Sequence, residues 1–153
     1  MSVTMNIRQG DALDLLRSLP NSSVDLIMTD PPYEFSSTKG GGSFGSKNRD
    51  YHDELTPISM GVTIEILDEM MRVMKVPNLY IWCNKAQIPQ YLEYFLGKKC
   101  KFDLLTWHKT NPVPTCHNKY LSDTEYCLYF RKGAQLYGSY ETKRKYWVTS
   151  TNT

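Results

Sequence analysis

Residues 24–33 read VDLIMTDPPY, and this stretch decides the fold of the chain. The apolar run at residues 24–29 is short and is ended by Pro31 and Pro32, which is typical of a strand buried on both faces of a sheet. A second run of this kind, LYIWC, occupies residues 79–83. Around these runs, apolar residues recur at helical intervals, which predicts helices over residues 12–19, 62–74 and 88–96.

Three further strands are predicted at residues 5–9, 104–108 and 125–130. Because strands and helices alternate, the sequence predicts an α/β fold with a mostly parallel sheet and helices on both faces. No helical pattern separates the last two strands, so we expect them to form an antiparallel hairpin at one edge of the sheet.

The composition is that of a single globular domain. The 153 residues carry a formal net charge of +2 and are 41% hydrophobic, which argues against disorder. No apolar run is long enough to cross a bilayer, and the first residues lack the pattern of a secretory signal. We therefore expect a cytoplasmic protein with no membrane partner.

The sequence offers little support for a metal site or for a dinucleotide-binding loop. The chain has no Cys-x-x-Cys pair, so we expect no metal site and reduced thiols at Cys83, Cys100, Cys116 and Cys127. A G-x-G-x-x-G pattern falls at Gly40, Gly42 and Gly45, but no strand directly precedes it and no helix follows. The polar residues 34–55 are instead predicted to form a mobile loop beside the candidate site.

Asp30 to Tyr33 follow a predicted strand, at the end where open α/β sheets collect their ligands. Pro31 and Pro32 fix the backbone and donate no hydrogen bonds, so the carbonyl groups of this stiff segment are left as acceptors. A carboxylate and a rigid carbonyl beside an aromatic ring suit a planar ligand that carries an amino group. Asp11 is a second acidic residue at the end of a predicted strand.

Four segments, in this order, resemble the amino-group DNA methyltransferases. They are GDALDLLRSLPNSSVDLIMTDPPY at residues 10–33, LYIWCNK at 79–85, LTWHKTNPVP at 105–114 and SDTEYCLYFRKG at 122–133. The resemblance extends over residues 5–133 and is to the subgroup in which the catalytic half precedes the cofactor-binding half. It implies a partial Rossmann-like methyltransferase sheet, S-adenosyl-L-methionine as the cofactor and DNA as the partner.

The resemblance assigns catalysis to the segment of Asp30, Pro31, Pro32 and Tyr33. The carboxylate of Asp30 and the carbonyl of Pro31 would accept hydrogen bonds from the target amino group, while Tyr33 stacks on a base flipped out of the duplex. Family members with aspartate before Pro-Pro-Tyr are mostly adenine N6 enzymes, which implies adenine as the target. Cytosine N4 stays an alternative.

The remaining assignments also rest on the resemblance. Asp11, together with Asp30, is expected to bind the cofactor, with Asp11 accepting from its adenine amino group. The pocket for the target base is expected to include Tyr33, Asn111 and Pro112.

The sequence departs from the family pattern after Gly133, where no glycine-rich cofactor loop follows. Residues 1–153 are therefore expected to be a single catalytic domain that is truncated: a fragment, a phage or prophage gene, or half of a split restriction-modification enzyme. Alone, it is expected to bind S-adenosylmethionine weakly or not at all. A complementing chain or a second copy is expected to pair with exposed sheet edges.

Residues 134–153 are predicted to form a basic tail. Its basic residues are Lys143, Arg144 and Lys145. They are either solvated or in contact with DNA phosphates. The alternative to an enzyme half is a non-catalytic DNA-binding or interaction remnant of such an enzyme.

Overall fold

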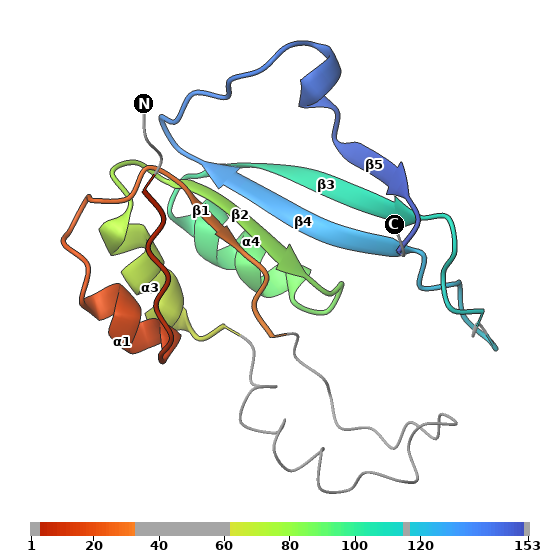
Figure 1. The fold of residues 1–153 in the computed structure, drawn as a ribbon, viewed down its shortest axis with the longest axis horizontal. Coiled ribbons are helices and arrows are strands. Elements are labelled where there is room, and N and C mark those ends of the chain that lie inside the picture. Colours follow the sequence, from red (N-terminus) through yellow and green to blue (C-terminus); the bar gives the residue numbers. More distant parts are fainter. Residues whose placement is uncertain (1–3, 33–61, 115–116, 152–153) are drawn as a thin grey trace, which may run out of the picture.

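The computed structural model describes residues 4–32, 62–114 and 117–151. Tyr33, the predicted loop at residues 34–55 and Cys116 lie outside these ranges. The elements follow one another as α1 (Ala12–Arg17), β1 (Ile27–Thr29), α3 (Ile64–Val73), β2 (Asn78–Cys83), α4 (Ile88–Gly97), β3 (Lys101–Lys109), β4 (Thr124–Arg131), the 3-10 turn η2 (Glu141–Lys143) and β5 (Tyr146–Thr149) (Figure 1).

The strands form one open sheet in the order β1-β2-β4-β3-β5. β1 and β2 are parallel, and so are β3 and β5, whereas β4 runs antiparallel to both of its neighbours. The α/β fold and the antiparallel pairing of the last two predicted strands are confirmed. The sheet is mixed rather than mostly parallel, because β4 returns from β3 and inserts between β3 and β2. The hairpin of β3 and β4 does not form the edge of the sheet as predicted, because β5 extends the sheet beyond β3.

Alternation along the central strands places the core on one face of this sheet. Leu79 and Ile81 of β2, with Leu128 and Phe130 of β4, are almost completely buried, and they pack against helices α3 and α4. The ring of Phe95 in α4 stacks on Phe130 with centroids 4.3 Å apart. This contact fixes α4 over the middle of the sheet.

The opposite face of the sheet is covered by the segment between β4 and β5. Residues 134–145 loop back from the end of β4 to the start of β5, and within the described ranges they supply only the single turn η2 on that side (Figure 1). The expectation of helices on both faces therefore holds for α3 and α4 on one face, while the other face carries one 3-10 turn.

The predicted strand at residues 5–9 is wrong. Residues 4–9 form no strand, and Met5 and Ile7 are 80% and 84% exposed. The apolar alternation is present in the sequence, but among the described residues no neighbouring strand pairs with this segment. An isolated strand leaves its backbone groups and its apolar side chains in water, so it has nothing to stabilise it.

Strand β5 lies within residues 134–153, for which the sequence pattern predicts a tail. It pairs with β3 through four register positions, from Thr106↔Tyr146 to Lys109↔Thr149. The indole of Trp107 also donates a hydrogen bond to the Thr149 hydroxyl over 2.7 Å. In the part of the chain that the structure describes, no helix is long and apolar enough to cross a membrane.

Candidate functional site at the carboxyl end of the sheet

Asp30 directly follows β1, at the carboxyl end of the parallel pair β1/β2. The register Thr29↔Ile81 places it next to Trp82 on the neighbouring strand. Its side chain is exposed, and none of the described residues forms an ion pair with it. The carboxylate is therefore available as a hydrogen-bond acceptor.

Cys127 shows on which face this carboxylate lies. Burial, together with the negative charge of Asp30, raises the pKa of the Cys127 thiol to about 11. Cys127 and Trp82 are paired in the register of β2 and β4, and both face away from α3 and α4. Asp30 thus lies close to the face of the sheet that the helices leave open.

The prolines after Asp30 continue the chain beyond the sheet. Pro31 is half-buried and Pro32 is exposed, with no regular secondary structure at either residue. Because a proline has no N–H, these two residues offer carbonyl oxygens without competing donors. A donor approaching Asp30 therefore meets acceptor groups on adjacent residues.

Asp11 has a structural role in α1. Its Oδ1 atom accepts hydrogen bonds from the backbone N–H groups of Leu13 (2.9 Å) and Asp14 (3.1 Å), which makes it the N-cap of the helix. The other carboxylate oxygen, Oδ2, has no hydrogen-bond partner among the described residues. Asp11 therefore keeps one oxygen for a further donor.

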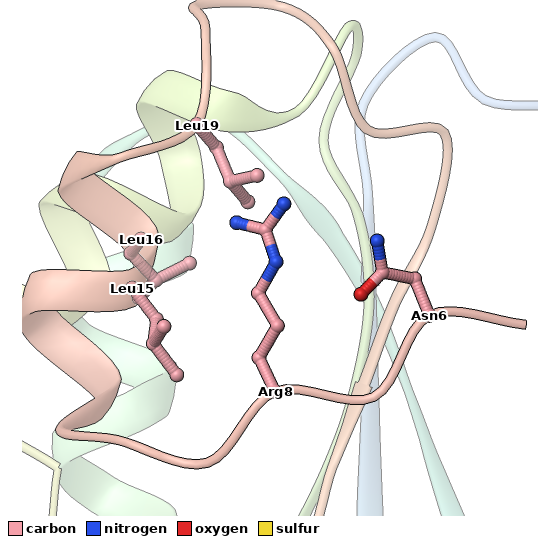
Figure 2. Close-up of a pocket in the computed structure, with 5 residues that line it drawn as sticks. All are labelled: Asn6, Arg8, Leu15, Leu16 and Leu19. Carbon is pink, nitrogen blue, oxygen red and sulfur yellow. The ribbon is translucent and has the colours of Figure 1, made fainter.

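A cavity of about 370 Å³ separates α1 from the segment before it (Figure 2). Leu15 and Leu16 of α1, with Leu19 just after the helix, form one wall, and on the other side Arg8 extends its guanidinium toward Leu19. The apolar side of α1 is therefore left without a close-packed neighbour at this place.

Asn111 and Pro112 lie beyond the carboxyl end of β3, which is the same end of the sheet as Asp30. Two strands separate β3 from β1, so at about 4.8 Å per strand the two ends are roughly 14 Å apart. The Oδ1 atom of Asn111 accepts hydrogen bonds from the backbone N–H (2.8 Å) and the hydroxyl (3.1 Å) of Thr151. In this structure the Oδ1 atom of Asn111 therefore holds the segment after β5.

Trp82 is the neighbour of Asp30 that the sequence analysis missed. It was counted only as part of an apolar strand, yet in LYIWC the positions of Tyr80 and Trp82 alternate with those of the core residues. This alternation was the available signal, because it places both aromatic rings on the face opposite Leu79 and Ile81.

Comparison with known proteins adds the family. No family model matches the chain. The type II methyltransferase M.HinfI of Haemophilus influenzae is 30% identical over 118 residues, which are 71% of this chain and 32% of that protein. M2.LlaDCHI of Lactococcus lactis subsp. cremoris is 27% identical over 89% of this chain and 55% of its own length. M2.DpnII of Streptococcus pneumoniae is also 27% identical, over 92% of this chain and 57% of its own length.

Solved structures share the fold. The crystal structure of M1.HpyAVI matches 94% of this chain and 65% of its own with a TM-score of 0.61 at 18% identity. The cytosine-N4-specific PvuII DNA methyltransferase matches 92% of this chain and 55% of its own with a TM-score of 0.56 at 15% identity. The chain thus spans between a third and somewhat over half of the curated relatives named above. As the resemblance of its motifs predicts, the chain is related to the type II DNA methyltransferases.

Proposed function

We propose that this chain carries the amino-group-binding part of an S-adenosylmethionine-dependent DNA methyltransferase, one that methylates the N6 atom of an adenine flipped out of DNA. The observation that carries the proposal is the position of Asp30. It is an exposed carboxylate at the carboxyl end of a parallel strand, without an ion-pair partner among the described residues and followed by two prolines. The relatives' activity supports the proposal, but they extend well beyond the part that this chain matches.

The chemistry needs acceptors more than it needs a base. The lone pair of an exocyclic amine is delocalised into the ring, so the amine is a poor nucleophile. Hydrogen bonds from its two protons to the Asp30 carboxylate and the Pro31 carbonyl would draw the nitrogen toward tetrahedral geometry and direct the lone pair at the methyl donor. In the proposed mechanism Tyr33 stacks on the flipped base and holds its plane.

S-adenosylmethionine, when bound, would supply an electrophilic methyl group on a sulfonium. The described residues fit only part of this cofactor. Asp11 keeps its Oδ2 atom for a hydrogen bond from the adenine amino group, although its Oδ1 atom already caps α1. A crystal structure of M1.HpyAVI, which has the same fold, is a complex with S-adenosylmethionine. We propose the same cofactor here, with its remaining contacts made outside the described residues.

Exposed surfaces support the proposal that a further polypeptide completes the enzyme. β1 is an edge strand whose outer side pairs with no described strand; Leu26, just before it, and Met28, within it, are 45% and 68% exposed. The neighbouring segment exposes Met5 and Ile7. An unpaired edge flanked by apolar side chains favours the addition of another strand. A complementing chain or a second copy of this chain would provide one.

The test is methyl transfer from tritiated S-adenosylmethionine to DNA, with and without the polypeptide encoded by the adjacent reading frame. Asp30→Asn keeps the size of the side chain but removes the charge, and we expect it to lower the rate at least a hundredfold. Asp25→Asn is the matched control, because Asp25 is an exposed carboxylate five residues earlier whose one ion-pair partner among the described residues is Lys75. Equal activity of the two variants would show that Asp30 takes no part in catalysis, whereas no methyl transfer by the natural chain, with or without the added polypeptide, would favour the non-catalytic remnant.

The target base is decided by the same assay. Aspartate before Pro-Pro-Tyr supports adenine, whereas the fold is equally that of the cytosine-N4-specific PvuII enzyme. Digestion of the methylated DNA to nucleosides and mass spectrometry separate the two products. We expect N6-methyladenine, and N4-methylcytosine would reassign the specificity.

A further inference from the structure

A second cavity, of about 410 Å³, lies between the open face of the sheet and residues 136–147. Aromatic rings form much of its wall, and we call it the aromatic cavity after Tyr80, Trp82, Tyr129 and Trp147. Its volume lies within the range of small-molecule sites in proteins. It is separate from the Leu-lined cavity at α1.

The aromatic wall is rigid. The rings of Tyr80 and Tyr129 stack with centroids 4.2 Å apart and planes inclined by 15°. Tyr129 is only 3% exposed, and its hydroxyl donates a hydrogen bond to Oδ1 of Asn78 over 3.1 Å. A flat surface held in this way favours stacking of a planar ring against it.

Cations surround the aromatic wall. Lys143, Arg144 and Lys145 line the cavity, and of these Lys145 is paired with Asp103. Lys143 and Arg144 have no ion-pair partner among the described residues. Two positive charges at the rim are therefore not neutralised within the described structure.

Arg131 is a third cation without an ion-pair partner among the described residues. It lies two residues after Tyr129 in β4, on the same face of the sheet. The structure gives its guanidinium no hydrogen bond among the described residues, and its Nε atom is enclosed by protein. Arg131 is not part of the lining of the aromatic cavity; with Lys99, Lys101 and Lys132 it lines a separate hollow at the end of β4. An enclosed donor without a partner is costly, and an anion would offset that cost.

We propose that the aromatic cavity binds a nucleotide, with the base against the aromatic wall and the phosphate against Lys143 and Arg144. An apolar polypeptide layer would also cover the rings, but it would bury these cations without partners, which opposes binding. A free nucleotide and a nucleotide unit of a single DNA strand carry the same chemistry. The proposal goes beyond methyl transfer, because binding here requires neither Asp30 nor a methyl donor.

Titration of the full chain with adenosine, AMP and a single-stranded hexanucleotide tests the proposal. Stacking on Trp82 and Trp147 should quench tryptophan fluorescence, and calorimetry gives the affinity independently. We expect AMP to bind at least tenfold more tightly than adenosine, because only AMP engages the cations. If the hexanucleotide binds at least tenfold more tightly than AMP, the ligand is a DNA strand; similar affinities indicate a free nucleotide.

Variants separate the two parts of the cavity. The double change Lys143→Gln with Arg144→Gln should lower the affinity for AMP about tenfold and leave adenosine unaffected. Trp82→Leu should lower the affinity for both AMP and adenosine. Lys119→Gln, an exposed lysine between β3 and β4 that does not line the cavity, is the control for net charge and should change nothing.

Arg131→Met provides a readout that does not need the ligand. Because the guanidinium is unpaired, its removal should leave the thermal midpoint of the free chain unchanged or raised. Because Arg131 lies outside the aromatic cavity, AMP binding should weaken less than in the Lys143/Arg144 double variant. Absence of AMP binding, equal affinity for AMP and adenosine, or unchanged AMP binding in the Lys143/Arg144 double variant would each overturn the proposal.

Discussion

The two faces of the sheet are built from the same strands but differ in what covers them. On one face Leu79, Ile81 and Phe130 have no exposed surface and contact α3 or α4. On the other face Tyr80 and Trp82 are half-buried and border a cavity. Side chains that alternate along one strand thus have opposite environments.

This difference separates stability from recognition. The helix-covered face holds aliphatic side chains and the stacked pair Phe95–Phe130. The open face combines aromatic rings with unpaired cations, and Asp30 lies at its carboxyl end. Substitutions on the first face should therefore act on folding, and those on the second should act mainly on ligands.

The largest expected effect is on the covered face. Phe130→Ala removes a fully buried ring and its stacking contact with Phe95, so we expect the free energy of unfolding to fall by about 3–5 kcal/mol. Tyr80→Ala, on the other face of the sheet, removes a half-buried ring stacked on Tyr129 and should cost only about 1–2 kcal/mol. Urea unfolding followed by circular dichroism measures both. Equal losses would mean that both faces act as a core.

Much of the covered face could be predicted from the sequence. The helical spacing of apolar residues correctly located α3 and α4, and the apolar runs located β2 and β4 to within one residue at each end. These elements bury their side chains against one another, so local periodicity and tertiary contacts agree.

The predictions from sequence fail where pairing with a distant segment of the chain decides the structure. Residues 5–9 have a strand pattern but no described neighbour, whereas residues 146–149 gain strand structure because β3 offers them a free edge. Pairing of this kind depends on contacts distant in sequence, which periodicity does not contain. The same applies to the cavity: Lys143 and Arg144 were expected in a tail, and their position beside Tyr80 follows only from the path of the chain.

Raising the pH should lower the free energy of unfolding by less than Phe130→Ala does. Because each face of the sheet carries one buried thiol, this pH dependence compares the two faces. Burial raises the pKa of Cys83 to about 12 and that of Cys127 to about 11, and these residues lie on opposite faces. A raised pKa means that the folded state prefers the protonated thiol. Its contribution to stability is therefore complete below pH 9, the ordinary value, and is lost as the pH rises toward 11 or 12.

We expect each thiol to account for a loss of about 1 kcal/mol in unfolding free energy between pH 8 and pH 10. Unfolding curves for the natural chain, Cys83→Ser and Cys127→Ser measure this, because each variant should show a shallower dependence on pH than the natural chain. Thiolate absorbance at 240 nm should appear for Cys127 at lower pH than for Cys83. Ionisation of either thiol near pH 9 in the folded chain would contradict the burial of that face.

The smallest effect concerns Asp11, which lies outside both faces and combines a structural contact with a proposed ligand contact. Asp11→Ala removes the N-cap of α1 and should cost about 1 kcal/mol, whereas Asp11→Asn keeps an oxygen that can cap the helix and should change stability by only a few tenths. If the carboxylate also binds the cofactor, the Asn variant should retain the stability of the natural chain but raise the KM for S-adenosylmethionine in the complemented enzyme. A KM unchanged by Asp11→Asn would leave Asp11 with the helix cap alone, and the acceptor for the cofactor would have to come from another residue.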